Sequence, residues 1–217
     1  MSILSLNNIS FSYGTTRVLE NLSLEFEKGK MYCIIGKSGA GKTTLLSLLS
    51  GLASVKGGSI CYEGKDIKKI DKYKFRSKYV GVIFQSYNLI TKFTALENVV
   101  LSMQIAGVKG KHKKQKAMTL LEKVGLSEDE ANRRVLKLSG GQQQRVAIAR
   151  ALSYDANIIL ADEPTGNLDA ETQDEIMQIF RSLTNEGKCV IIVSHSPDVA
   201  KACDQCYELK KVSKTKN

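Results

Sequence analysis

Tryptophan is absent from the sequence, and only two prolines and two histidines occur among its 217 residues. No apolar run approaches the roughly 18 residues that a membrane-spanning helix needs, so we expect no transmembrane segment. The first residues, 1–5, lack the basic and apolar regions of a secretory signal peptide, and we therefore expect a cytoplasmic protein. Cys203 and Cys206 form a C-x-x-C pair, but no second pair accompanies them, so we expect no zinc site.

Aromatic residues are also sparse, at 6%, whereas positive charge is in excess. The 32 lysines and arginines outnumber the 22 acidic residues, which gives a formal net charge of +10. Such a balance fits a nucleic-acid partner or an anionic membrane surface. Part of the charge lies in two lysine runs, 109–116 and 210–216, and such runs are usually solvated. We therefore expect no nucleic-acid partner and keep attraction to a membrane surface as an alternative.

Two patterns of apolar residues predict strands. Apolar and polar residues alternate over 3–13 and 18–26, as in half-buried strands of an antiparallel sheet. Short continuous apolar runs predict buried strands at 31–35, 80–84, 157–161 and 190–193. Helical segments separate these buried runs, and this alternation predicts an α/β fold with a mostly parallel core sheet.

Three successive helices are predicted in the middle of the chain. Thr94–Glu97 has the capping-box pattern and precedes a helical stripe of apolar residues. A second stripe covers 117–124, and a third helix begins after Ser139 and extends to Leu152. We therefore expect one domain over 1–217: a core sheet, an antiparallel β subdomain, and a helical lobe at about 86–155.

A complete phosphate-binding loop lies between a predicted strand and a predicted helix. Its residues match G-x-x-x-x-G-K-[ST]: Gly36, Lys37, Ser38, Gly39, Ala40, Gly41, Lys42 and Thr43. The glycines bring backbone N–H groups close to phosphate oxygens, and the helix beginning at Thr44 adds its positive end. Lys42 supplies a charge to the β- and γ-phosphates, and the Thr43 hydroxyl is a ligand for Mg²⁺. We therefore expect ATP and Mg²⁺ as cofactors.

Two carboxylates end the predicted strand at 157–161. The carboxyl ends of parallel strands meet at one edge of the sheet, where ligands bind. Asp162 can hold Mg²⁺, and Glu163 can orient and deprotonate an attacking water molecule. The pair is weak evidence alone, but together with the phosphate loop it predicts nucleotide hydrolysis.

A second anion site is predicted at Ser139, Gly140, Gly141 and Gln142. Ser139 is a good N-cap, and the two glycines expose backbone N–H groups at the start of a helix. With Leu138, these residues match the signature of the ATP-binding-cassette (ABC) ATPases, and the chain resembles that family over almost its whole length. The resemblance implies a P-loop NTPase fold of ABC type.

The resemblance also implies roles for four further residues. Tyr13 corresponds to the aromatic residue that stacks on adenine, although a lone tyrosine is more often surface packing. Gln85 corresponds to a glutamine that touches Mg²⁺ and the attacking water, and His195 to a γ-phosphate switch histidine. Asp169 belongs to a loop that crosses to a partner subunit, and it is also a candidate N-cap.

The partners implied by the resemblance are a second copy of the chain and a membrane permease. Two copies would form a head-to-tail dimer with two ATP molecules at its interface. The segment 87–93 would dock on the permease, which would hold the ATPase at the inner face of the cell membrane. Details such as Phe84-Gln85-Ser86-Tyr87-Asn88-Leu89 resemble macrolide-exporter and lipoprotein-release ATPases, which favours export or extraction of a peptide, lipoprotein or antimicrobial compound. Ser196 after His195, and the tail at 208–211, depart from the common family pattern.

Two other functions remain open at this point. The same subgroup contains membrane-associated ATPases that regulate cell division or envelope proteolysis without transport, and their catalytic residues would be identical. ABC ATPases that act on DNA or the ribosome usually have a coiled-coil insertion or a second cassette, and this chain has neither. The transported substrate leaves no signal in the sequence, because this subunit does not contact it.

Overall fold

The centre of the fold is a five-stranded parallel sheet with the strand order β6-β7-β8-β3-β9. The computed structural model describes residues 2–212. The strands of this sheet are β3 (Met31–Ile35), β6 (Val80–Ile83), β7 (Ile158–Asp162), β8 (Cys189–Val193) and β9 (Gln205–Glu208). The side chains of β8 are all buried, because layers of structure cover both faces of the sheet. The predicted parallel core is confirmed.

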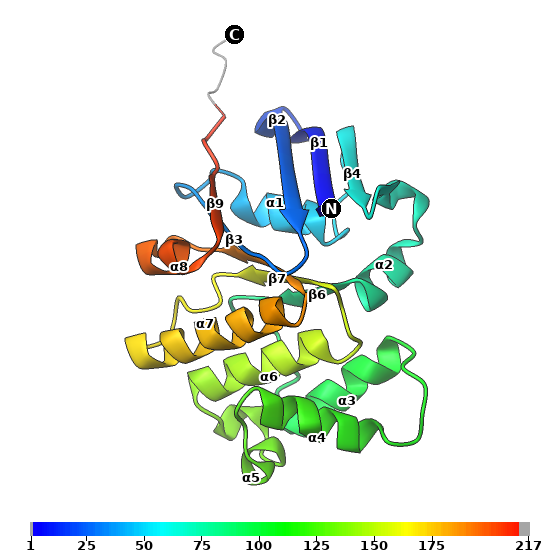
Figure 1. Cartoon of the computed structure of the whole chain (residues 1–217), viewed down its shortest axis with the longest axis vertical. Helices are drawn as coiled ribbons and strands as arrows, with labels where there is room; N and C mark the ends of the chain where they lie inside the picture. The colour runs from blue at the N-terminus through cyan, green and yellow to red at the C-terminus, as the bar shows by residue number, and fades with distance from the viewer. Residues whose placement is uncertain (1, 213–217) are drawn as a thin grey trace.

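An antiparallel sheet with the order β2-β1-β4-β5 covers one side of this core (Figure 1). Its strands are β1 (Ser2–Tyr13), β2 (Thr16–Glu27), β4 (Gly57–Tyr62) and β5 (Lys65–Asp66). The alternating pattern predicted both long strands, and Leu6 of β1 pairs with Leu24 of β2. Between the two sheets lies α1 (Lys42–Leu49), and its buried leucines join one hydrophobic core with residues of both sheets.

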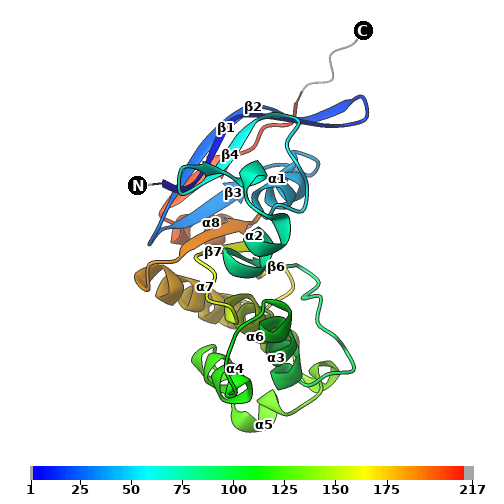
Figure 2. The same ribbon diagram turned by 90° about the vertical axis from the view of Figure 1, so that its right-hand side faces the viewer.

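Helices lie on the opposite side of the parallel sheet, as Figure 2 also shows. Two of them, α6 (Gly140–Leu152) and α7 (Ala170–Asn185), contact its strands. The others, α3 (Ala95–Ile105), α4 (Lys113–Lys123) and α5 (Glu128–Ala131), lie beyond α6. The predicted capping box at Thr94 begins α3. Ser139, predicted as an N-cap, begins α6 and forms a capping box with Gln142. Apolar residues of these helices and of the sheet form the second hydrophobic core.

Several short elements have no counterpart in the sequence predictions. They are η1 (Ile67–Lys69), α2 (Lys72–Lys78), η2 (Val135–Lys137), α8 (Pro197–Ala202), α5, and the strands β5 and β9. Each is too short to show a helical or strand period, although Asp71 and Ser196 cap α2 and α8 with their side chains. Within residues 2–212, no helix combines the length and hydropathy needed to cross a bilayer.

Gly81 provides a test of how closely α6 packs on β6. A Cβ atom at Gly81 would lie 2.5 Å from the carbonyl oxygen of Ala151 and 3.0 Å from Cδ1 of Ile159. We expect Gly81→Ala to lower the free energy of unfolding by about 1–3 kcal/mol, because the backbone must move apart to admit the methyl group. Urea denaturation measures this change.

Gly57→Ala is the matched control, since a Cβ there would meet its nearest neighbour, Cβ of Ser10, at 3.9 Å. We expect its effect to stay within about 0.5 kcal/mol. Equal stabilities for the two variants would contradict the close packing of α6 on β6.

Candidate nucleotide-binding site

The phosphate loop connects β3 to α1, and two of its glycines occupy positions where a side chain does not fit. Gly41 is the N-cap of α1 in the left-handed conformation, with φ 95°, and a Cβ there would lie 2.9 Å from Cγ1 of Val18. A Cβ at Gly36 would lie 2.6 Å from the carbonyl oxygen of Leu209. No side chain caps α1, so its first N–H groups can bind an anion.

Lys42 is the first residue of α1, and its ammonium group turns back over the loop. The Nζ atom donates a hydrogen bond to the carbonyl oxygen of Gly36 at 2.7 Å. An ammonium group has three N–H donors, so two remain for phosphate oxygens. The loop therefore combines backbone donors, a helix N-terminus and a positive charge at one place.

The acidic pair lies at the end of β7, beside the ends of β8 and β3. Asp162 pairs with Val193 of β8, and Val193 pairs with Ile34 of β3 just before the phosphate loop. Glu163 adopts the left-handed conformation, with φ 45°, and its N–H donates to the carbonyl oxygen of Val193 at 2.9 Å. A non-glycine residue in this conformation is strained, and such strain is common at functional sites.

His195 follows β8 and contacts Glu163. Its Nδ1 atom lies 2.9 Å from Oε2 of Glu163. The side chain of Glu163 is only 13% exposed, whereas that of His195 is 72% exposed. The histidine can therefore hold the carboxylate in place and still reach a ligand from the solvent side.

Burial raises the pKa of Asp162, and the neighbouring charge of Glu163 raises it further. A hydrogen bond from Thr43 and the charge of Lys42 oppose this shift in pKa. A divalent cation would also favour the charged carboxylate. Asp162, Thr43 and Gln85 line the same cavity and offer oxygen ligands, which fit Mg²⁺. Among residues 2–212, no cluster of three or more His, Cys, Asp or Glu side chains could hold a metal ion by itself. This does not conflict with an Mg²⁺ site, because Mg²⁺ bound together with a nucleotide needs only one or two carboxylates.

These residues enclose one cavity of about 460 Å³. Its lining contains Val18, Ser38, Gly39, Gly41, Lys42, Thr43, Thr44, Gln85, Asp162, Glu163 and His195. The structure thus brings together predicted residues from the phosphate loop, the acidic pair, the Gln85 loop and the end of β8. Val18 of β2 was not predicted, because an apolar residue in a strand gives no signal of ligand contact.

Gly36, Lys37 and Ala40 of the phosphate loop do not line this cavity, and neither do three other groups of predicted residues. Tyr13 ends β1, is 58% exposed, and packs edge-on against Phe11 with 5.0 Å between the ring centroids. Its role at adenine stays a prediction. The signature residues 139–142 and Asp169 also lie outside the lining residues.

The signature residues form the N-terminus of α6, where space is restricted. A Cβ at Gly141 would lie 2.6 Å from Cγ2 of Thr172, and one at Gly140 would lie 3.2 Å from the hydroxyl of Tyr87. Asp169 caps α7 by accepting a hydrogen bond from the N–H of Thr172 at 2.8 Å. The starts of α6 and α7 therefore pack together. The second anion site at residues 139–142 stays a prediction.

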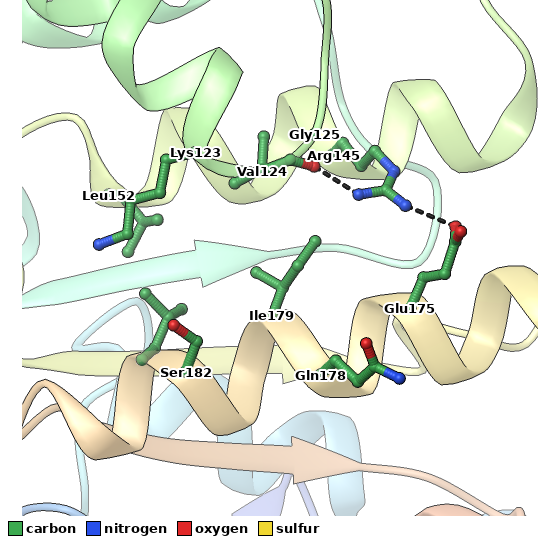
Figure 3. A pocket seen from close by; sticks show the side chains of 10 residues that line it. Lys123, Val124, Gly125, Arg145, Leu152, Glu175, Gln178, Ile179 and Ser182 are labelled. Atoms are coloured by element: carbon green, nitrogen blue, oxygen red, sulfur yellow. Dashed lines mark hydrogen bonds and ion pairs between the residues drawn. The ribbon is translucent and has the colours of Figure 1, made fainter.

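Another pocket, of about 350 Å³, lies between α4, α6 and α7 (Figure 3). Arg145 spans it, donating hydrogen bonds to the carbonyl oxygen of Val124 and to the carboxylate of Glu175. The guanidinium group of Arg145 therefore has hydrogen-bond partners within the pocket. The pocket contains none of the predicted nucleotide-binding residues, and Arg145 holds the helices together there.

A phosphate loop with two carboxylates and a histidine in one cavity defines the active site of a P-loop nucleotide hydrolase. Comparison with known proteins agrees: residues 19–166 match the profile of the family described as ABC transporter. The chain therefore belongs to the ABC transporter family, as one of its ATP-binding, ATP-hydrolysing cassettes.

The relatives include the uncharacterised ABC transporter ATP-binding protein YclH of Bacillus subtilis, 46% identical over 99% of this chain and 96% of YclH. LolD of Bacteroides fragilis, the ATP-binding protein of a lipoprotein-releasing system, is 41% identical over 95% of this chain and 97% of LolD. MacB of Mannheimia succiniciproducens, a macrolide export protein, is 40% identical over 97% of this chain and 34% of its own length. The predicted resemblance to macrolide-exporter and lipoprotein-release ATPases is confirmed.

Solved structures support the same conclusion. The cassette MJ0796, in a dimeric post-hydrolysis state with ADP and Pi, superposes with a TM-score of 0.86. It is 35% identical, and the match covers 95% of this chain and 94% of MJ0796. The predicted ABC-type fold, with its parallel sheet, antiparallel sheet and helical lobe, is therefore confirmed.

The raised pKa of Asp162 predicts that its ionised carboxylate lowers the stability of the folded protein. At pH 7 the folded protein holds a carboxylate that burial disfavours, and this cost disappears as the pH falls and Asp162 becomes protonated. In the absence of nucleotide and Mg²⁺, we expect Asp162→Asn to raise the Tm by about 2 °C at pH 7. The gain should shrink toward pH 4, and calorimetry at both pH values measures it.

Asp174→Asn, on the exposed face of α7, is the control and should change the Tm by less than about 1 °C at either pH. A lower Tm for Asp162→Asn at pH 7 would show that the charged form is favoured in the folded protein.

Proposed function

We propose that this chain is the ATPase subunit that drives a separate membrane permease, in the export or extraction of a peptide, lipoprotein or antimicrobial compound. The observation that supports this best is the single cavity that joins the phosphate loop, Gln85, Asp162, Glu163 and His195. LolD and MacB, whose names refer to lipoprotein release and macrolide export, support the substrate class. The permease would hold the chain at the inner face of the membrane.

In this proposal, the cavity binds the phosphates of ATP together with Mg²⁺. Lys42 and the N–H groups of α1 bind phosphate oxygens, while Thr43, Asp162 and Gln85 hold the metal ion. Mg²⁺ supplies charge stabilisation to the phosphates. Glu163 accepts a proton from the attacking water, and its contact with His195 keeps the carboxylate oriented toward the γ-phosphate.

The second anion site suggests how two copies assemble. The N-terminus of α6, with Ser139, Gly140 and Gly141, does not line the cavity of its own chain. In a head-to-tail dimer it would instead cover the ATP that is bound to the partner's phosphate loop. Asp169 lies at the adjacent start of α7, where it can meet the partner at the same interface. MJ0796, which is dimeric, supports this arrangement.

A groove of about 420 Å³ between α2, α3 and the loop after Gln85 is the proposed permease docking site. Its rim exposes three large apolar side chains, Tyr73 (77%), Ile90 (42%) and Ile105 (75%). Arg150 of α6 donates hydrogen bonds to the carbonyl oxygens of Tyr87 and Asn88. The groove is therefore lined both by the loop that follows Gln85 and by α6, which begins at the signature residues. A permease segment bound there would contact both elements.

Glu163→Gln tests the catalytic assignment and the dimer together. Glutamine keeps the shape of the side chain but removes the base and one negative charge near the γ-phosphate. We expect ATP hydrolysis to fall at least about a hundredfold, and ATP with Mg²⁺ to convert the variant from monomer to dimer. Size-exclusion chromatography with light scattering and a phosphate-release assay measure both effects.

Adding Ser139→Arg to this variant should abolish the dimer, because the larger side chain blocks the second anion site. Glu186→Gln is the matched control, since Glu186 forms an ion pair with Lys123 away from the cavity, and it should hydrolyse ATP at the wild-type rate. Near-normal hydrolysis by Glu163→Gln would rule out its role as the base. A monomer in the presence of ATP would rule out the composite site.

A further inference from the structure

Two short segments each have a net charge of +5: the lysine run 109–116 and residues 65–78. We call residues 65–78, which contain β5, η1 and α2, the basic segment. It has seven lysines and arginines and two aspartates, a net charge of +5 against +10 for the whole chain. The two aspartates cap helices: Asp66 accepts from the N–H of Lys68 at 2.9 Å, and Asp71 from that of Lys74 at 2.7 Å. They are therefore fixed at local backbone positions.

Six of the seven cations of the basic segment are exposed, and none of the seven is neutralised by an ion pair among residues 2–212. Lys28, Lys123 and Lys188 elsewhere in the chain do form ion pairs. The six lysines are exposed, and they are Lys65, Lys68, Lys69, Lys72, Lys74 and Lys78. Arg76, the seventh cation, is half-buried and donates to the carbonyl oxygen of Gly51. Exposed charges without partners create a field that attracts an anionic surface.

The basic segment also lies beside the proposed docking groove. Tyr73, Arg76 and Ser77 of α2 form one wall of that groove, and Figure 2 shows α2 and α3 on the same side of the molecule. A permease segment that enters the groove comes from the membrane, so this wall faces the bilayer. Tyr73 is 77% exposed, with the Arg76 guanidinium 5.2 Å from its ring centroid. An exposed tyrosine among lysines suits the headgroup region of a membrane.

We propose that the basic segment binds anionic lipid headgroups of the membrane that contains the permease. This proposal rests on the proposed docking groove, because the groove determines which side faces the bilayer. Screening limits the attraction to about 8 Å at physiological salt, so only cations on this side contribute strongly. Nucleic acid fits less well, because the segment exposes a single aromatic ring for base stacking.

Vesicle co-sedimentation with the purified full chain tests the proposal without the permease. The probes are sucrose-loaded vesicles of phosphatidylcholine, alone or with one third phosphatidylglycerol, in 0.15 M KCl. We expect clear binding to the anionic vesicles and at least fivefold weaker binding to the neutral ones. The triple variant Lys68→Gln, Lys69→Gln, Lys74→Gln should reduce the partition coefficient on anionic vesicles at least tenfold.

A second triple variant, Lys201→Gln, Lys210→Gln, Lys211→Gln, is the matched control. It removes the same charge near α8 and the end of β9, on the side of the molecule away from α2 (Figures 1 and 2). We expect its partition coefficient to change less than twofold. Equal losses in the two triple variants would show that overall charge, and not the basic segment, drives binding, and absence of excess binding to anionic vesicles would overturn the proposal.

Two further readouts distinguish lipid binding from nucleic-acid binding and from a loss of ATPase function. The first readout is a gel shift with duplex DNA or RNA at the same salt. If the triple variant of Lys68, Lys69 and Lys74 loses a nucleic-acid complex but still binds vesicles, the partner of the basic segment is nucleic acid and not lipid. ATP hydrolysis by this variant should equal that of the wild type, since none of the three lysines lines the nucleotide cavity. If the lipid-binding proposal fails, the proposed ATPase function is therefore unaffected. The Glu163→Gln experiment tests the ATPase function separately.

Discussion

The parallel pairing of β7, β8 and β3 is the constraint on which the active site depends. The register places Asp162, Val193 and Ile34 side by side across the three strands. The chain leaves each strand at the same edge of the sheet, so the acidic pair, His195 and the phosphate loop emerge together. Backbone hydrogen bonds continue this alignment beyond the strands, from Glu163 to Val193 and from Ser194 to Ile34. A shift in register would separate the base from the phosphate loop.

Two features of the active site are energetically unfavourable in the folded chain. Glu163 has a left-handed backbone, and burial beside this second carboxylate raises the pKa of Asp162. Bound Mg²⁺ and nucleotide would compensate the charges at the site. The hydrophobic cores on both faces of the sheet stabilise the strands that hold these residues. The protein therefore gives up stability locally for function, which is common in enzymes.

The sequence predicted the parts of the site that depend on contiguous motifs. The phosphate loop, the acidic pair and the N-cap at Ser139 each have a local physical signature. Long periodic segments predicted the core strands and the lobe helices. Short elements such as α2 and β9 escaped prediction, because they span too few residues to show a period. Val18 and the groove beside Tyr73 depend on contacts between distant segments. The roles of Tyr13, Ser139 and Asp169 involve a nucleotide or a partner copy, so one chain alone does not test them.

The central claim is that each active site combines the phosphate loop of one copy with the signature residues of another. Mixing two inactive variants, Lys42→Ala and Ser139→Arg, tests it most directly, because each variant damages a different half of the site. Each mixed dimer has one intact site, formed by the phosphate loop of the Ser139→Arg copy and the signature residues of the Lys42→Ala copy. The account predicts that an equimolar mixture recovers ATPase activity that neither variant has alone. A mixture as inactive as either variant alone would contradict it.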